Sequence, residues 1–163
     1  MGTGESGRYL STKGSGRSVS DYAVVHSLEG TFTYDQNGHI SRMKSGGHGE
    51  ENMRILEKAG MKYNVVKTYG NGVRAGNIPL HKNPKKRTGA GQTWFPKGWT
   101  EKDIKRAGSH VASLKKNRKA KDGQAVYGMY KGVRVGIIKT NGKIATVFPD
   151  THQPSRRRGK RKK

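Results

Sequence analysis

Tight turns that end in glycine separate short runs of apolar and β-branched residues in this chain. Asn71-Gly72, Lys131-Gly132 and Asn141-Gly142 are pairs that suit two-residue turns between antiparallel strands. They predict a hairpin over residues 62–78 and a three-stranded meander, with strands at 125–130, 133–140 and 143–148. The fold should therefore contain antiparallel sheet.

Two amphipathic helices accompany these strands. The first follows the Gly46-Gly47 pair, carries two glutamates in its first turn and ends before Gly60. The second covers about residues 101–114, because Thr100 is a good N-cap and Asp103 stands at the spacing of a capping box. Helices and antiparallel strands are mixed without βαβ alternation, so the predicted fold class is α+β.

An internal similarity indicates duplication. Gly72-Val-Arg-Ala-Gly-Asn-Ile78 resembles Gly132-Val-Arg-Val-Gly-Ile-Ile138, and each segment begins directly after a predicted turn. Chance similarity of two glycine-rich hairpins is the alternative. We favour a duplicated helix-plus-hairpin unit, which predicts two sheets that face one another across a cleft.

Charge dominates the composition. The chain has 163 residues, about one domain's worth, with 34 Lys and Arg against 11 Asp and Glu, a net charge of +23. Such an excess predicts a polyanionic partner, nucleic acid first, because each cation placed on a phosphate releases counterions. Hydrophobic residues make up only 30% and 24 residues are Gly, so the core should be small. No apolar run approaches the length of a membrane span.

The two ends differ from the body. Residues 1–22 alternate Gly, Ser and charges and are interpreted as a flexible leader or linker, without the apolar stretch of a secretory signal. Residues 155–163 carry seven positive charges and are predicted to be a disordered basic tail. The folded domain should cover residues 23–154.

Histidine is the main candidate for chemistry, because the chain lacks Cys altogether. None of the six His shows a convincing zinc-ligand spacing, so no metal site is predicted. His26, His110 and His152 are interpreted as ordinary surface or packing residues. His48 follows two glycines at the start of a helix, where it could stand beside a bound phosphate or simply be an N-cap residue.

His81 opens a dense basic loop over residues 82–91 that contains Lys82, Lys85 and Lys86. A histidine among cations suits a phosphodiester site, since nearby positive charge holds its pKa down as a general base requires. The alternative is a solvated basic loop with an incidental histidine.

Aromatic and hydroxyl residues could hold a nucleoside. Trp94 could stack on a base or ribose, although a Trp before a helix is more often in the core. In the last strand Ile144, Thr146 and Phe148 should share one face, from which Thr146 could hydrogen-bond a pyrimidine edge and Phe148 could stack. Both side chains could equally fill the core between the sheets.

Several of these blocks, in order, resemble the bacterial EndoU nuclease domain. They cover about residues 40–150 and comprise Gly46-Gly-His48, the segment 72–82, Gln92-Thr-Trp-Phe-Pro96 and the segment 142–150. The resemblance implies an RNase A-related fold of two facing antiparallel sheets with flanking helices. It also implies cleavage of single-stranded RNA, often tRNA in bacterial toxins and usually at uridine, that leaves 2′,3′-cyclic phosphate and 5′-hydroxyl ends without a cofactor.

The resemblance also implies roles for single residues. His81 resembles the general base that takes the 2′-OH proton, and His48 resembles the general acid that protonates the leaving 5′-oxygen. A family lysine stabilises the phosphorane, and Lys85 is our choice for it, with Lys82 and Lys86 close behind.

Thr146 and Phe148 resemble the Thr-x-Tyr pair that positions base and sugar. Phe148 keeps the stacking surface of that tyrosine and loses its hydroxyl.

Further expectations follow from the resemblance. Such domains commonly form the C-terminal part of larger secreted toxins, so we expect delivery into the target-cell cytoplasm. We expect a cognate, acidic immunity protein, because the toxin is strongly cationic, and a monomer. Two alternatives are a non-catalytic basic RNA-binding protein and a metal-dependent DNase toxin of the His-Asn-His type, prompted by His81-Lys-Asn83.

Overall fold

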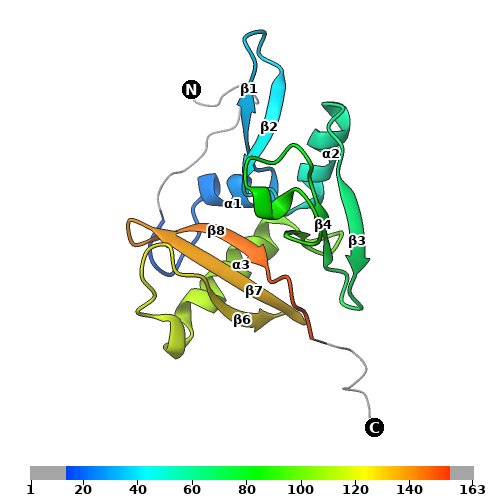
Figure 1. Ribbon diagram of the computed structural model, residues 1–163. Coiled ribbons are helices and arrows are strands. Elements are labelled where there is room, and N and C mark those ends of the chain that lie inside the picture. The colour runs from blue at the N-terminus through cyan, green and yellow to red at the C-terminus, as the bar shows by residue number, and fades with distance from the viewer. Residues whose placement is uncertain (1–13, 155–163) are drawn as a thin grey trace.

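The computed structural model describes residues 14–154, and they form an α+β fold with three antiparallel sheets (Figure 1). The predicted leader 1–22 lies outside the described residues over positions 1–13, and so does the predicted tail 155–163. In chain order the elements are α1 (Asp21–Leu28), β1 (Thr31–Tyr34), β2 (Ile40–Ser45), α2 (Glu50–Lys58), β3 (Asn64–Thr68), β4 (Arg74–Asn77), η2 (Pro84–Lys86), β5 (Gln92–Trp94), α3 (Glu101–Ser113), η3 (Lys115–Asn117), β6 (Val126–Tyr130), β7 (Val133–Thr140) and β8 (Lys143–Pro149).

The sheets are a hairpin, β1-β2, and two meanders, β3-β4-β5 and β6-β7-β8. The two similar segments, 72–78 and 132–138, contain β4 and the first part of β7, which are the central strands of the two meanders. Each meander follows a helix, α2 or α3, as expected from a duplicated unit. The meanders meet where the Thr93 hydroxyl of β5 donates to the Pro149 carbonyl of β8 at 2.8 Å.

Two of the three predicted turns are confirmed. Both residues of Lys131-Gly132 and of Asn141-Gly142 have positive φ, as a primed two-residue turn requires. The prediction for Asn71-Gly72 was wrong. Tyr69 and Val73 enclose a three-residue connection in which Gly72 N–H donates to the Tyr69 carbonyl, and Gly72 has positive φ while Asn71 does not.

The Asn71 side chain explains that turn. Its amide donates to the Gly132 carbonyl at 3.0 Å, in the turn of the other meander, and its oxygen accepts from Val73 N–H at 3.1 Å. The Asn71 side chain thus links the turns of the two meanders, a contact that the spacing of residues in the sequence does not show.

Helix α1 and the hairpin β1-β2 had no counterpart among the predicted elements. The Ser20 hydroxyl caps α1 by accepting from Ala23 N–H at 3.1 Å, and Val19 and Val24 are buried. The helix therefore begins within the segment interpreted as a leader. The second and third helices, by contrast, start and end as predicted, with a complete capping box between Thr100 and Asp103.

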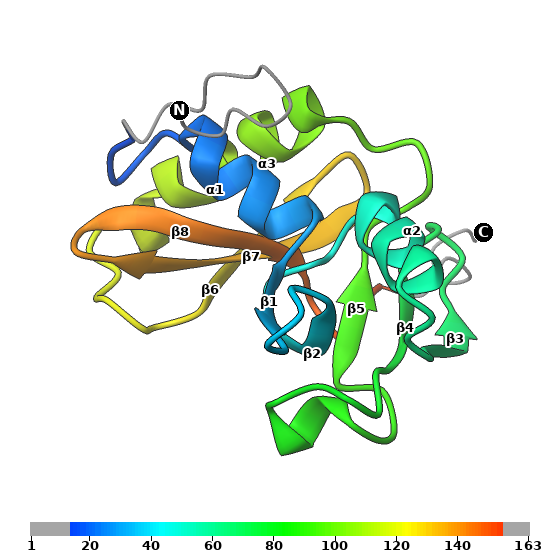
Figure 2. The ribbon, with the colours of Figure 1, turned by 90° about the horizontal axis from the view of Figure 1, so that it is seen from above.

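Two hydrophobic clusters form the core. In the first, α1 and α3 cover one face of the β6-β7-β8 sheet (Figure 2). The second joins α2 to β2, to β5 and to Ile78, which directly follows β4. Among residues 14–154 no helix is both long and apolar enough to cross a lipid bilayer.

A β-bulge changes the face of one predicted site residue. Ile138 pairs with Thr146 while Lys139 pairs with Ile144, so Ala145 is an extra residue in β8. The bulge turns Ile144 into the core with Val147 and leaves Thr146 on the opposite, open face. The prediction that Ile144 shares a face with Thr146 and Phe148 was therefore wrong.

Candidate active site

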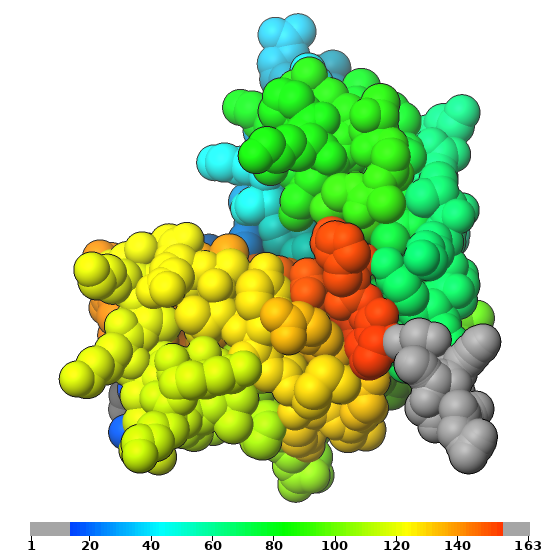
Figure 3. Space-filling model, turned by 60° about the horizontal axis from the view of Figure 1, so that its bottom comes forward, coloured from blue at the N-terminus to red at the C-terminus, as the bar shows by residue number. Residues whose placement is uncertain are grey.

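A cavity of about 280 Å³ lies where the two meanders meet. Figure 3 shows, from below, the segment that follows β8 between the two halves of the molecule. Residues from both halves line the cavity: Ser45, Gly46, His48, Lys86, Gly91, Thr93, Tyr127, Ile138, Thr146, Phe148, Pro149, Asp150 and Thr151.

The end of α1 fixes the backbone around His48. The N–H groups of residues 47, 48 and 49 donate to the carbonyl oxygens of residues 26, 27 and 28, at 3.1, 2.6 and 3.0 Å. The carbonyls of residues 27 and 28 lie at the C-terminal end of the helix, where intrahelical donors run out, while the His26 carbonyl also accepts from Gly30 N–H at 3.0 Å. The His48 carbonyl in turn accepts from Phe95 N–H at 2.7 Å. His48 is therefore held between α1 and the residue that follows β5 of the first meander.

The glycine pair before His48 serves packing rather than anion binding. Gly46 and Gly47 both have positive φ. A Cβ on Gly46 would lie 2.3 Å from the His26 carbonyl oxygen, and one on Gly47 would lie 2.5 Å from the Asn52 amide nitrogen. The N–H groups of residues 47–49 are already engaged by α1, so these three are not free to bind a phosphate.

The tautomer of His48 follows from its neighbour. Its Nδ1 lies 2.7 Å from the Thr93 carbonyl oxygen, which can only accept, so Nδ1 carries the hydrogen and Nε2 keeps its lone pair. Burial holds the pKa of His48 well below its ordinary value and the positive charge of Lys86 lowers it further, while the Thr93 hydrogen bond opposes both. His48 is therefore a neutral base near pH 7.

His26 belongs to the same region, although its sequence context suggested an ordinary role. Its Nε2 lies 2.8 Å from the position a Cβ would take on Gly46, a lining residue of the cavity. Its Nδ1 is 2.8 Å from the Thr31 hydroxyl. Burial and Lys86 lower its pKa. No local motif marks this residue, because the pairing of α1 with residues 47–49 creates its position.

His81 does not line the cavity. Its side chain is 1% exposed, its Nδ1 accepts from Asn83 N–H at 2.9 Å, and its buried Nε2 has no hydrogen-bond partner among residues 14–154. Burial, Lys86 and Arg87 lower the pKa of His81 to about 4. The position is that of a packed histidine at the base of the loop.

The basic loop presents one lysine to the cavity. Lys86 lines it and is half-buried, and burial lowers the pKa of its ammonium. Its charge also lowers the pKa of His26, His48 and His81. Lys85, our sequence-based choice, is exposed and outside the lining, as is Lys82.

Of the three predicted nucleoside-binding residues, two line the cavity and one does not. Thr146 and Phe148 line the cavity, and the Phe148 ring lies 5.9 Å from that of His48. Trp94 is 0% exposed and donates from Nε1 to Asn52 at 3.0 Å. Its ring is enclosed in the core, so the expectation that it binds substrate was wrong.

Tyr127 joins this site without any signal in the sequence. Its ring stands edge-on to Phe148 at 5.9 Å and 86°, and the Arg134 guanidinium lies 4.7 Å from its centre. Burial, then the nearby charge of Asp150, raises the pKa of Tyr127. A Cβ on Gly136, which pairs with both residues, would lie 2.6 Å from Phe148 and 2.8 Å from Tyr127, so the missing side chain makes room for both rings.

Residues 20–151 match the model of the bacterial EndoU nuclease family. The chain belongs to that family. Neither the curated proteins nor the solved structures gave a match to it.

The cavity lined by residues of both meanders is therefore the candidate nuclease site of this EndoU domain. The match begins at residue 20 and so includes α1 and its histidine. Within the described part of the chain, no group of three or more His, Asp or Glu side chains is arranged to hold a metal ion. Two imidazoles, one ammonium and an aromatic wall with hydroxyls can transfer protons, stabilise phosphate charge and hold a nucleoside.

Proposed function

We propose that this EndoU nuclease is a metal-independent endoribonuclease that cleaves single-stranded RNA by attack of the RNA's own 2′-hydroxyl. The observation that carries the proposal is the hydrogen bond of His48 Nδ1 to the Thr93 carbonyl, which leaves the lone pair on Nε2 of a ring that lies in a cavity with Lys86 and an aromatic wall. The nucleophile belongs to the substrate, so the protein needs only proton transfer, charge stabilisation and positioning.

In the proposed reaction His48 Nε2 takes the 2′-OH proton, and the oxygen forms a bond to phosphorus. The bond between phosphorus and the 5′-oxygen breaks, and His26 supplies a proton to that oxygen. The products are a 2′,3′-cyclic phosphate and a 5′-hydroxyl. The bound phosphodiester favours the charged form of His26, which offsets the effect of burial and Lys86 on its pKa.

These roles differ from those that the family resemblance suggested. His81 is buried and does not line the cavity, whereas His26 packs against Gly46 of the lining, so we propose His26 rather than His81 as the partner of His48. The Thr93 hydrogen bond leaves a lone pair on His48 Nε2, which suits a base rather than an acid.

Lys86 takes the role for which Lys85 was chosen. Its ammonium lines the cavity and is partly desolvated, so its interaction with the extra negative charge of the phosphorane is strong. Lys82 and Lys85 can attract the RNA backbone from the exposed side of the loop.

Thr146, Phe148 and Tyr127 form the proposed nucleoside site. The Phe148 ring offers a stacking surface, the Thr146 hydroxyl can donate or accept, and the Tyr127 phenol supplies a hydroxyl that Phe148 lacks.

The biological setting is proposed on the basis of charge and family resemblance. We propose that the domain is the C-terminal, secreted part of a larger toxin, acts on tRNA in the target-cell cytoplasm as a monomer, and is neutralised by an acidic immunity protein. The net charge of +23 supports both polyanionic partners. Pull-down with the product of the adjacent reading frame tests the immunity partner.

The direct test is cleavage of total tRNA in excess EDTA by wild type and by His26→Ala, His48→Ala and His81→Ala. We expect wild type to leave 2′,3′-cyclic phosphate ends, the first two variants to lose at least 100-fold in rate, and His81→Ala to remain the most active of the three. Cleavage that requires added divalent metal would refute the mechanism, and RNA binding without cleavage would favour a non-catalytic protein.

A further inference from the structure

A second hollow, of about 320 Å³, lies on the other side of His26. It is formed by the first turns of α1, the start of β1 and the hairpin end of β7 and β8. Its lining residues are Ser20, Tyr22, Ala23, His26, Thr31, Thr140, Lys143, Ile144 and Ala145.

The hollow adjoins the active-site cavity through two elements. His26 lines the hollow, and its Nε2 packs against Gly46, which lines the cavity. Strand β8 passes both sites: Ala145 lines the hollow and Phe148 lines the cavity, three residues or about 10 Å along the strand. The sites are close enough for neighbouring nucleotides of one RNA strand, with His26 between them.

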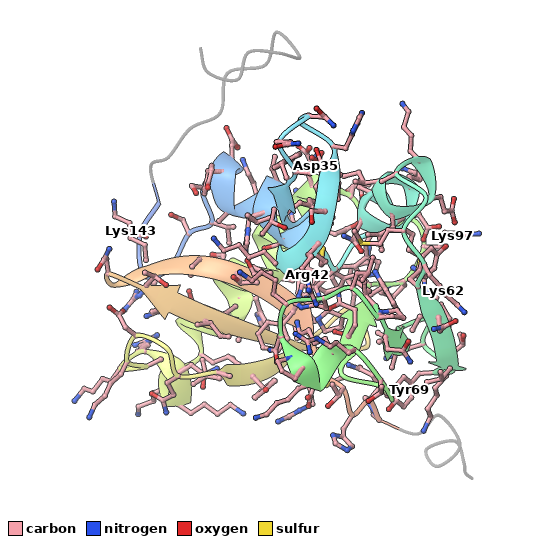
Figure 4. All side chains as sticks on the ribbon, turned by 45° about the horizontal axis from the view of Figure 1, so that its top comes forward. Asp35, Arg42, Lys62, Tyr69, Lys97 and Lys143 are labelled. Atoms are coloured by element: carbon pink, nitrogen blue, oxygen red, sulfur yellow. The ribbon has the colours of Figure 1, made fainter. Side chains whose placement is uncertain are left out.

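The chemistry of the lining suits single-stranded nucleic acid. Tyr22 is 58% exposed, so an aromatic face is open to a base. Lys143 is exposed at the outer end of the β7–β8 hairpin, where Figure 4 labels it, and can pair with a phosphate. Thr31 and Thr140 add hydroxyls, and the lining contains no carboxylate. The neighbouring Asp21 pairs with Lys105 instead.

We propose that this hollow binds the nucleoside of the leaving group, the one whose 5′-oxygen is released, with its base on Tyr22 and the following phosphate at Lys143. The proposal rests on the proposed ribonuclease function. It assigns His26 the position between two nucleosides, from which it can deliver a proton to the bond that breaks.

Two substrates distinguish the effect of a substitution in the hollow from an effect on the catalytic site. Uridine 3′-(4-nitrophenyl phosphate) has no nucleoside in its leaving group, whereas the dinucleotide UpA has one. For each protein we compare the ratio of kcat/KM for UpA to kcat/KM for the aryl ester. Tyr22→Ala should lower this ratio about tenfold, because base–aromatic stacking is lost only with UpA. The matched control is Tyr34→Ala, which removes another exposed aromatic ring, on the β1-β2 hairpin.

A second variant tests the phosphate contact. Lys143→Ala should lower kcat/KM for UpApA severalfold relative to the aryl ester, and the effect should shrink as salt rises.

The outcomes are distinct. A ratio that stays at the wild-type value in Tyr22→Ala, or an equal loss on both substrates, overturns the proposed subsite. Loss of binding to an acidic protein with an unchanged ratio also overturns it, by assigning the hollow to a protein partner. If wild type cleaves neither substrate nor tRNA, the proposed function itself fails and the subsite falls with it.

Discussion

Replacement of His81 by asparagine should make the stability of the domain less sensitive to acid. The asparagine oxygen can keep the hydrogen bond from Asn83 N–H that His81 Nδ1 now accepts, but the side chain no longer titrates. The folded-state pKa of His81 is about 4, against 6.5 as its ordinary value. Well above pH 6.5 the ring is neutral in both the folded and the unfolded state, and this histidine adds no dependence on pH.

As pH falls below 6.5 the unfolded chain takes up a proton that the folded protein does not, so the free energy of unfolding decreases. The loss from His81 alone is about 2 kcal/mol between pH 8 and pH 5 and reaches about 3 kcal/mol near pH 4, where the folded state also becomes protonated. We expect His81→Asn to be less stable than wild type at pH 8, because it leaves space in the core, and to lose less stability on acidification.

Urea unfolding followed by tryptophan fluorescence from pH 8 to pH 4.5 measures this difference. His39→Asn is the control, because His39 is exposed on the β1–β2 hairpin. The lowered pKa values of His26 and His48 also make the free energy of unfolding decrease on acidification. Only the difference between wild type and variant therefore reports on His81. Parallel curves of unfolding free energy against pH for wild type and His81→Asn would refute this account of His81.

Three further substitutions test other parts of the site. Lys86→Met should lower kcat on RNA by about 100-fold or more, whereas Lys85→Met, on the exposed side of the loop, should change it less than about threefold; equal effects would contradict the choice of Lys86. Trp94→Phe should lower the free energy of unfolding in urea by about 1–3 kcal/mol, because the buried Asn52 side chain loses its donor, and should leave kcat near that of wild type. A loss of kcat without a loss of stability would indicate that Trp94 contacts the substrate. Gly136→Ala should raise KM for RNA about tenfold by displacing the two rings of the aromatic wall, and an unchanged KM would separate that wall from substrate binding.

Much of the fold could be predicted because its signals are local. The capping box at Thr100 and the turn at Asn141-Gly142 depend on residues a few positions apart, and both are formed as expected. Helix α1 was missed because a short, partly β-branched segment after a Gly/Ser-rich stretch carries little periodic signal, and its stability comes from packing on β8 and α3. The bulge at Ala145 was missed because strand periodicity assumes an unbroken register.

The site was predicted in part for the same reason. His48, Thr146 and Phe148 stand in motifs, and the structure brings them to one cavity. His26 could not be found locally, because its place depends on hydrogen bonds between the end of α1 and residues some twenty positions later.

Lys86 and Lys85 are adjacent in one basic loop, and only the path of that loop decides which ammonium faces the cavity. The contact between Tyr127 and Phe148 likewise results from strand pairing, because Gly136 of β7 stands opposite both residues.

The central claim is that the cavity between the meanders cleaves RNA through the substrate's 2′-hydroxyl. A single-stranded oligonucleotide with one preferred cleavage site, prepared with ribose or 2′-deoxyribose at the attacking nucleotide, tests it most directly. After digestion in excess EDTA, mass spectrometry should show a 2′,3′-cyclic phosphate and a 5′-hydroxyl from the ribose substrate and no cleavage at the deoxy position. His48→Ala should form neither product. Cleavage at the deoxy position, or a 5′-phosphate product, would contradict the account.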